Sequence, residues 1–364
     1  MKKNKIFGEV EILYYNDTVD VIYEACTACY DNTKNLSYEE KKEYIQKRVN
    51  CGHDSVLEHG FLSFIIHDIK TNIFTEALLE VINHSHYLYI YSSQNEDESW
   101  NVMIGGSIRA YKSLIKEFIN DHLDDSSDID NFILNHIINT LHSTTVKEFY
   151  CDINNALIDS RKFLDIPFEL NGVGNVYDSW GHNNLEVNNI KILDYPCGLN
   201  NIYSTAYRYG FLENEVNNII PVTVLFSNMS RTATHQLVRH RNAITQESQR
   251  YVNSSNAKFT TPDMSSYMKD YKEKRVSIDI FGNKTNTTLD ILGSELIKIY
   301  DQLVNQGLKK EDARAFLPSN VQCKRLYMTF TINSLNKFLE LRTDPHAQTE
   351  IRSYALDIKY LLDK

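Results

Sequence analysis

The sequence predicts an α+β fold, because segments with helical periodicity alternate with segments of strand-like periodicity along its 364 residues. The clearest strand signal is Tyr87-Leu-Tyr-Ile-Tyr91, which alternates with a period of two. The clearest helical signal is an apolar stripe over 289–306 that stops at Gly307. A capping box formed by Ser37 and Glu40 marks the start of another helix. A chain that mixes both kinds of signal is expected to contain both helices and strands.

The N-terminal segment is predicted to form two strands and two helices. In order, we expect a strand over 9–15, helices over 18–30 and 37–50, and a strand over 61–66. The second helix stops at Cys51-Gly52, and a polar turn then leads into the strand. Apolar residues at both odd and even positions of that strand predict burial on both of its faces.

The middle of the chain carries weaker signals. In order, we expect a helix over 69–84, a hairpin of strands 87–91 and 102–104, a helix over 108–119 and an acidic surface loop over 121–131. From 132 to about 205 the periodicity fades, and the recognisable features are turns at 171–174, 179–181 and 196–198. Gly172-x-Gly174 lacks the rest of a dinucleotide-binding fingerprint and is interpreted as a turn.

Regular periodicity returns in the C-terminal segment. In order, we expect a strand over 221–226, a helix capped by Ser230 and running to about Arg241, helices over 289–306 and 311–316, a strand over 325–332, and helices over 333–342 and 345–362. The inward stripe of the 289–306 helix is predicted to be Leu292, Leu296, Ile299 and Leu303. No internal repeat is convincing.

Composition narrows the functional classes. The formal net charge of -10 argues against general binding to nucleic acids or membranes. No segment has the apolar run of a signal peptide, and none approaches the ~18 apolar residues of a membrane span, so we expect a cytoplasmic protein. The six cysteines are scattered, which disfavours a disulfide framework. Cys26-x-x-Cys29 lies in an apolar helical pattern without a second pair, which favours packing over metal or redox chemistry; no metal site is predicted.

The segment from Ser230 to Tyr251 reverses the sign of the overall charge. It contains one acid, Glu247, and six basic residues: Arg231, His235, Arg239, His240, Arg241 and Arg250. On a helix, positions 231, 235 and 239 share one face. Gln246, Ser248 and Arg250 alternate and would face one ligand from an extended chain. Arginine forks with hydroxyl and amide donors suit a phosphorylated, planar ligand. The alternative is a solvated basic helix end.

The same segment resembles a known family. Thr234-His-Gln-Leu-Val-Arg-His-Arg241, followed by Gln246-Glu-Ser-Gln-Arg-Tyr251, is similar to the signature of flavin-dependent thymidylate synthases. Three further segments resemble family motifs in the right order: 52–59, 311–318 and 338–352. The resemblance covers roughly 20–66 and 221–362. It implies a division into an N-terminal catalytic part (1–68), an insertion (69–220) and a C-terminal catalytic part (221–364).

The resemblance also implies a fold and an activity. The fold would be a central antiparallel sheet flanked by helices, in a single domain with a large insertion. The activity would be transfer of a one-carbon unit from methylenetetrahydrofolate to dUMP, with hydride from FADH2 and with NADPH reducing the flavin. The family assembles as homotetramers with active sites shared between subunits, so the same is expected here.

Individual roles follow from the matching positions. Arg342 corresponds to the catalytic arginine, which stabilises the uracil ring as it loses its N3 proton. The positions expected to bind dUMP are Gln236, Arg239, Gln246, Glu247, Ser248, Gln249, Arg250 and Arg314. The positions expected to contact FAD are His53, Ser55, Glu58, Arg239, His240, Arg241, Asn333 and Lys337. No cysteine lies within these motifs. The structural alternatives are helix-end cations for Arg314 and Arg342, a backbone partner for His53 and a surface acid for Glu58.

Two departures from the family pattern affect the flavin. The loop between Arg241 and Ser248 is one residue shorter than usual. The family's Asn-Ala-Arg near the start of the penultimate helix is Thr331-Ile332-Asn333 here, and Lys337 replaces a polar contact. Two other functions therefore stay open: a related enzyme that makes hydroxymethyl-dUMP, and a nucleotide-binding or RNA-binding protein without catalysis.

Overall fold

The computed structural model describes residues 9–15, 18–30, 34–69, 87–122, 185–194, 199–259, 275–280 and 282–363, together with a few isolated positions. The predicted helix over 69–84 lies largely outside these residues, as do the turns at 171–174 and 179–181 and most of the loop over 121–131. None of the described helices is long and apolar enough to cross a membrane.

The first sheet is antiparallel and is built from the N-terminal third of the chain. Its strands, in spatial order, are β1 (Glu9–Tyr15), β2 (Phe61–Ile69), β4 (Trp100–Ser107) and β3 (Tyr89–Gln94). Between β1 and β2 the chain forms α1 (Thr18–Tyr30), α2 (Tyr38–Asn50) and the 3-10 helix η1 (Asp54–His59). Helix α4 (Ile108–His122) follows β4 directly. The predicted capping box is confirmed, because Ser37 and Glu40 exchange the two expected hydrogen bonds at the start of α2.

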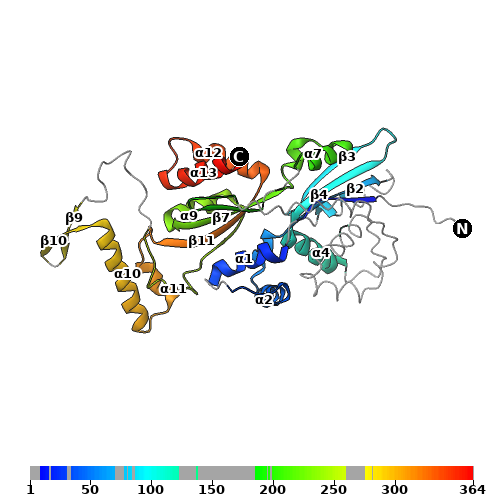
Figure 1. Cartoon of the computed structure of the whole chain (residues 1–364). Coiled ribbons are helices and arrows are strands. Elements are labelled where there is room, and N and C mark those ends of the chain that lie inside the picture. Colours follow the sequence, from blue (N-terminus) through cyan, green and yellow to red (C-terminus); the bar gives the residue numbers. More distant parts are fainter. Residues whose placement is uncertain are drawn as a thin grey trace.

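The second sheet is also antiparallel and belongs to the C-terminal half. Its strands, in spatial order, are β5 (Leu185–Val187), β6 (Ile190–Asp194), β7 (Pro221–Ser230), β11 (Gln322–Thr331) and β8 (Ala243–Gln246). The helices of this half of the chain are α7 (Leu199–Arg208), α8 (Glu213–Val216), α9 (Arg231–Leu237), α12 (Ile332–Thr343) and α13 (Thr349–Leu362). Of these, α7 packs on the first sheet (Figure 1). In Figure 1 the two sheets lie side by side, with α12 and α13 on one side and α1 and α2 on the other.

Each sheet has its own apolar core, and a third cluster joins them. Phe64, in β2, lies in the first core, and Phe330, in β11, lies in the second. A buried histidine also bridges the halves: the two ring nitrogens of His59 lie 2.9 Å from the hydroxyls of Thr329 and Thr245. Burial lowers the pKa of His59 to about 3, so this bridge is made by a neutral imidazole.

A long arm extends from the second sheet. It consists of β9 (Arg275–Ile280), β10 (Asn283–Thr288), α10 (Leu289–Asn305), α11 (Lys310–Ala313) and the 3-10 turn η6 (Arg314–Phe316). Figure 1 shows it at the end of the molecule opposite the N-terminus.

The inward face of α10 differs from the predicted stripe. The buried residues are Gly293, Ile297 and Tyr300, whereas Ile299 is 43% exposed. The ring of Phe259 lies so close to Gly293 that a Cβ there would sit 2.4 Å from it. Because only glycine admits this ring, the contact sets the rotation of the helix.

The structure confirms the α+β prediction, but the strands form two separate main sheets instead of one central sheet. This pairing bears on the predicted division at residues 68 and 220. β1 and β2 are hydrogen-bonded to β3 and β4, which were assigned to the insertion, and β5 and β6 are added to the sheet of β7. The elements β5, β6 and α7 were not predicted, because the stretch from 132 to about 205 carries little periodicity.

The Cys26-x-x-Cys29 pair lies within α1. Cys26 is 1% exposed in the first core, and burial raises the pKa of its thiol to about 12. Burial also raises the pKa of Cys29. Both thiols are therefore kept protonated, as the packing interpretation requires.

Candidate active site

The basic segment begins with a short helix and a sharp turn. The Ser230 hydroxyl accepts a hydrogen bond from the Ala233 amide and caps α9, as predicted. The α-helix ends at Leu237, earlier than predicted, and continues as a 3-10 turn over Val238–His240. Arg241 then takes a left-handed conformation with φ 52°, which is uncommon outside glycine. This reversal sends the chain into β8, which pairs with the neighbouring strand β11.

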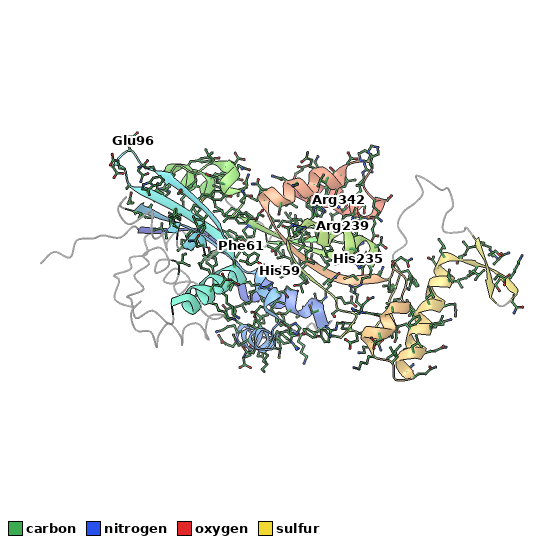
Figure 2. The ribbon with its side chains drawn as sticks, turned by 180° about the vertical axis from the view of Figure 1, so that it is seen from behind. His59, Phe61, Glu96, His235, Arg239 and Arg342 are labelled. Carbon is green, nitrogen blue, oxygen red and sulfur yellow. The ribbon has the colours of Figure 1, made fainter. Side chains whose placement is uncertain are left out.

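Arg342 meets two residues of this segment. Its Nε donates to Nε2 of His240 at 3.1 Å, and its Nη1 donates to Oε1 of Gln236 at 3.4 Å. Burial lowers the pKa of His240, and the charges of Arg342 and Lys337 lower it further. The imidazole is therefore neutral and can accept the bond. In Figure 2, Arg342 and Arg239 lie close together on the same flank, on α12 and the end of the α9 segment.

A pocket of about 390 Å³ opens beside α9. Five of the residues expected to bind dUMP line it: Gln246, Glu247, Ser248, Gln249 and Arg314. Arg231 and His235 line it as well. Two arginines and a serine hydroxyl at one cavity form a donor set that suits a phosphate.

Arg231 holds the rim of this pocket in place. Its side chain is buried, its Nη2 donates to the Glu247 carbonyl at 2.8 Å, and its Nη1 donates to Oε1 of Gln246 at 3.3 Å. Its Nε is buried without a hydrogen-bond partner. Sequence reasoning placed Arg231 on the polar helix face but gave it no role. Its position four residues before His235 was the available signal.

Glu247 contributes to the pocket mainly through its backbone. Its side chain is buried and accepts from the Lys324 amide at 2.7 Å. Its own amide donates to the Arg325 carbonyl at 3.1 Å. The carboxylate is therefore occupied in tying the loop to β11.

Two of the arginines expected to bind dUMP do not line this pocket. The chain turns after Ser248, whose hydroxyl accepts from the Arg250 amide at 3.3 Å. The predicted extended run from 246 to 250 is therefore wrong beyond Ser248. The Arg250 side chain instead pairs with Glu311 at 3.0 Å. Arg239 is exposed in the middle of η4 (Val238–His240) and lines neither this pocket nor the second one.

A second pocket, of about 380 Å³, lies where the two sheets meet. It is lined by Glu58 and Arg241, both expected to contact FAD. The other polar or aromatic residues around it include Tyr87, Tyr89, Ser107, Arg109 and Ser113. Arg109 and Glu58 form an ion pair. All five of these additional residues come from the segment assigned to the insertion, so their role could not be predicted from motifs.

The remaining predicted flavin residues lie elsewhere in the chain. His53 directly precedes η1, and its Nε2 lies 3.2 Å from the hydroxyl of Tyr30, the last residue of α1, while its ring faces Tyr251. Ser55 is exposed in η1. Lys337 is exposed on α12. The amide of Asn333 donates to Asn214 and Asn218, beside α8.

The second pocket fits part of the cofactor that the motifs imply. Two guanidiniums suit the diphosphate of FAD, serine hydroxyls and Glu58 suit a ribose, and tyrosine rings suit an adenine. Its volume lies within the range of small-ligand pockets. Among the described residues, no group of three or more His, Cys, Asp or Glu side chains is placed to hold a metal ion.

Comparison with known proteins adds an independent finding. Residues 213–364 match the family model described as thymidylate synthase complementing protein. That stretch contains the motifs over 234–251, 311–318 and 338–352 but not the motif over 52–59.

Individual relatives agree with the family match. A flavin-dependent thymidylate synthase of Pyrococcus abyssi is 35% identical over 139 residues, which cover 36% of this chain and 50% of the relative. Proteins of the same name from Pyrococcus furiosus and Thermosipho africanus are 34% and 32% identical, over 36% and 34% of this chain and 50% and 55% of those relatives. The chain thus spans about half the length of the curated relatives it matches.

Proposed function

We propose that this protein makes thymidylate from dUMP, because residues 213–364 match the family model described as thymidylate synthase complementing protein and the relatives are named flavin-dependent thymidylate synthases. In this proposal methylenetetrahydrofolate donates the one-carbon unit, FADH2 donates the hydride and NADPH reduces the flavin. The observation that carries the proposal is the meeting of Arg342 with Gln236 and His240, because it joins two motifs that lie a hundred residues apart.

Arg342 is the proposed electrostatic catalyst. Both of its hydrogen-bond partners are neutral, one an amide and the other an imidazole with a lowered pKa. Its positive charge is therefore not cancelled by them and can stabilise a uracil ring that loses its N3 proton and becomes nucleophilic at C5. Gln236 and His240 hold the guanidinium in one orientation.

The pocket beside α9 is the proposed site for the phosphate of dUMP. Arg314 and the Ser248 hydroxyl line it, and the buried Arg231 adds a second positive charge. Against a net charge of -10, such a local cluster is needed to attract a dianion. Gln249 and Gln246 offer amide groups that can read the edge of a pyrimidine.

The flavin, when bound, would supply the hydride that completes the methyl group. Glu58 and Arg241 would hold its nucleotide part in the pocket between the sheets. His53, Ser55 and Lys337 remain proposed contacts from the resemblance, whereas the side-chain amide of Asn333 is engaged by Asn214 and Asn218.

The active site is proposed to be shared between chains. Within one chain, Arg342 contacts Gln236 and His240, whereas the phosphate pocket is lined by Ser248 and Arg314. A neighbouring chain that brings its Arg342 to this pocket would complete the site, and Arg239 and Arg250, both exposed, would be available to that neighbour.

The proposal is tested by mass spectrometry of the nucleotide product. The purified protein is supplied with dUMP, methylenetetrahydrofolate, FAD and NADPH, and we expect thymidylate. Hydroxymethyl-dUMP would identify the related enzyme that adds water instead of hydride. Unchanged dUMP from a folded, flavin-loaded protein would overturn the proposal.

A further inference from the structure

The two main sheets share one topology. In the first sheet the order is β1-β2-β4-β3, and within the second it is β6-β7-β11-β8, with β5 added at the edge. In both, the strand that comes last in sequence lies between the second and the third. In both, helices connect the first strand to the second: α1 and α2 in one case, α7 and α8 in the other.

The strand registers agree residue by residue. Between β1 and β2 the register slips by one residue at Ser63 and Phe64, which are the third and fourth residues of β2. Between β6 and β7 it slips at Thr223 and Val224, which are the third and fourth residues of β7. Bulges are specific local features that related folds retain, so a bulge at the same position in both sheets indicates a common origin.

The junction with the following helix also agrees. The first residue of β2, Phe61, pairs with the last of β4, Ser107, and the first of β7, Pro221, pairs with the last of β11, Thr331. In each case a helix begins at the next residue. The Ile108 amide donates to Gly60 at 2.9 Å, and the Ile332 amide donates to Ile220 at 3.0 Å.

The two halves pack on each other reciprocally. In the first half, Met103 of β4 lies in a cluster with Ile202 and Ala206 of α7, from the second half. In the second half, Tyr327 of β11 lies in a cluster with Ala25 and Ala28 of α1, from the first half. Met103 and Tyr327 both lie four residues before the end of their strand. Such exchange of equivalent contacts is what a two-fold interface between copies produces.

We propose that the chain contains two copies of one unit, 9–122 and 190–343, and that the first copy supplies Arg109 as the ligand for the diphosphate of an adenine nucleotide. The matching registers place Ser107-Ile108-Arg109 where the second copy has Thr331-Ile332-Asn333. Arg109, the second residue of α4, is therefore the counterpart of Asn333, the second residue of α12.

The contacts of Asn333 and Arg109 show which of the two side chains is able to bind a diphosphate. The amide of Asn333 is occupied by Asn214 and Asn218 at 2.8 to 3.0 Å. Arg109 lines the 380 Å³ pocket together with Arg241 of the second copy, and its side chain is 46% exposed. Only one of its N–H groups is engaged with Glu58, and a guanidinium has five. Tyr87 and Tyr89 offer rings for the adenine.

The ligand follows from this donor set. Two arginines and two serines in one pocket of about 380 Å³ fit an ADP-sized group, which is the nucleotide half of FAD. The binding of an ADP-sized group is inferred from the pocket alone. Its identification as part of FAD rests on the proposed function.

The experiment is a calorimetric titration of the full chain with ADP, FAD and FMN, which lacks the adenosine. We expect Arg109→Gln to weaken ADP and FAD about tenfold or more, because a charge-assisted hydrogen bond is lost, and to leave FMN and dUMP binding unchanged. Lys116→Gln, an exposed cation two turns further along α4, is the matched control and is expected to bind like the wild type. The double variant Glu58→Gln/Arg109→Gln removes any repulsion by an unpaired Glu58 and is still expected to bind weakly.

Each outcome has one interpretation. Equal ADP and FAD binding by Arg109→Gln and the wild type would overturn the role of Arg109, as would an equal loss in Lys116→Gln. Recovery of full affinity in the double variant would also overturn it. Arg109-dependent binding of ADP without any binding of FAD would support the nucleotide site and overturn the proposed flavin chemistry.

Discussion

The proposed chemistry depends on the Arg342 side chain. Its fork reaches His240 and Gln236 at 3.1 and 3.4 Å, and lysine cannot reproduce both contacts. We expect Arg342→Ala to lower kcat for thymidylate formation about 100-fold or more, as for loss of a donor at a developing charge. Arg342→Lys should recover only part of the activity. Steady-state kinetics measure both, with unfolding midpoints as the control, and an alanine variant as active as the wild type would contradict this role.

We expect the buried, neutral His59 to make the folded protein less stable at low pH. Its folded pKa is about 3, against 6.5 for an ordinary histidine, because it is buried between Thr329 and Thr245. As the pH falls below 6.5 the unfolded chain gains a proton at His59 that the folded chain does not. Unfolding is therefore favoured progressively from pH 6.5 down to about 3.

This pH effect is measurable by urea unfolding. The interval from about pH 7.5 to about pH 5.5 brackets the ordinary histidine pKa. Over it, protonation of His59 in the unfolded chain should lower the free energy of unfolding by about 1.4 kcal/mol. The variant His59→Gln keeps a hydrogen-bonding amide but does not titrate. Over the same pH interval its free energy of unfolding should therefore fall by about 1.4 kcal/mol less than that of the wild type. Equal losses in the two proteins would show that His59 does not stay neutral in the folded state.

Two neighbouring glycines of β4 allow the packing of this strand on Ile219 to be tested. A Cβ at Gly105 would lie 2.4 Å from Cβ of Ile219, just before β7, whereas one at Gly106 would meet only the terminal Cδ2 of Leu88 at that distance. We expect Gly105→Ala to destabilise the protein by about 1–3 kcal/mol through overpacking. Gly106→Ala should cost clearly less, because the Leu88 side chain can rotate away. Denaturant unfolding of both variants is the measurement, and equal costs would argue against this tight packing of β4 on Ile219.

Elements with strong local signals were predicted well from the sequence. Helix α2 begins at its predicted capping box, and α1 has its predicted bounds. The predicted stripe of α10 was right only in part: Leu292, Leu296 and Leu303 are half-buried, but Ile299 is exposed. The long-range contact between Gly293 and Phe259 sets a rotation that periodicity alone does not reveal. The loop after Gln246 was wrong beyond Ser248 for a similar reason: a turn and the Arg250–Glu311 pair determine its path.

The candidate site was predictable only in part. Motif matches found Arg342, Gln236 and His240, which the fold brings together. They could not find Arg109, because it comes from a segment with no family motif, or Arg231, which the fold buries at the pocket rim. The internal repeat was also invisible in the sequence. Strand registers and bulges preserve it, whereas equivalent residues such as Arg109 and Asn333 differ in chemistry.

The two copies in one chain predict the size of the assembly. The resemblance implies an enzyme built from four copies of the unit. Because each chain contains two copies, two chains would supply all four. The internal repeat thus replaces the expected tetramer of chains by a dimer, and we expect a particle of about twice 42.3 kDa in analytical ultracentrifugation. The control variant Lys116→Gln should form a particle of the same mass. A particle of four chains would show that the fused units do not replace separate subunits.

The proposal that this chain uses a flavin on dUMP is tested by one spectrum. The purified protein is incubated with FAD, freed of unbound cofactor, and its visible absorbance is recorded before and after addition of dUMP. We predict a retained flavin band that shifts when dUMP binds, because the nucleotide lies against the isoalloxazine ring. A folded protein that retains no flavin, or a flavin band that dUMP leaves unchanged, would contradict the account.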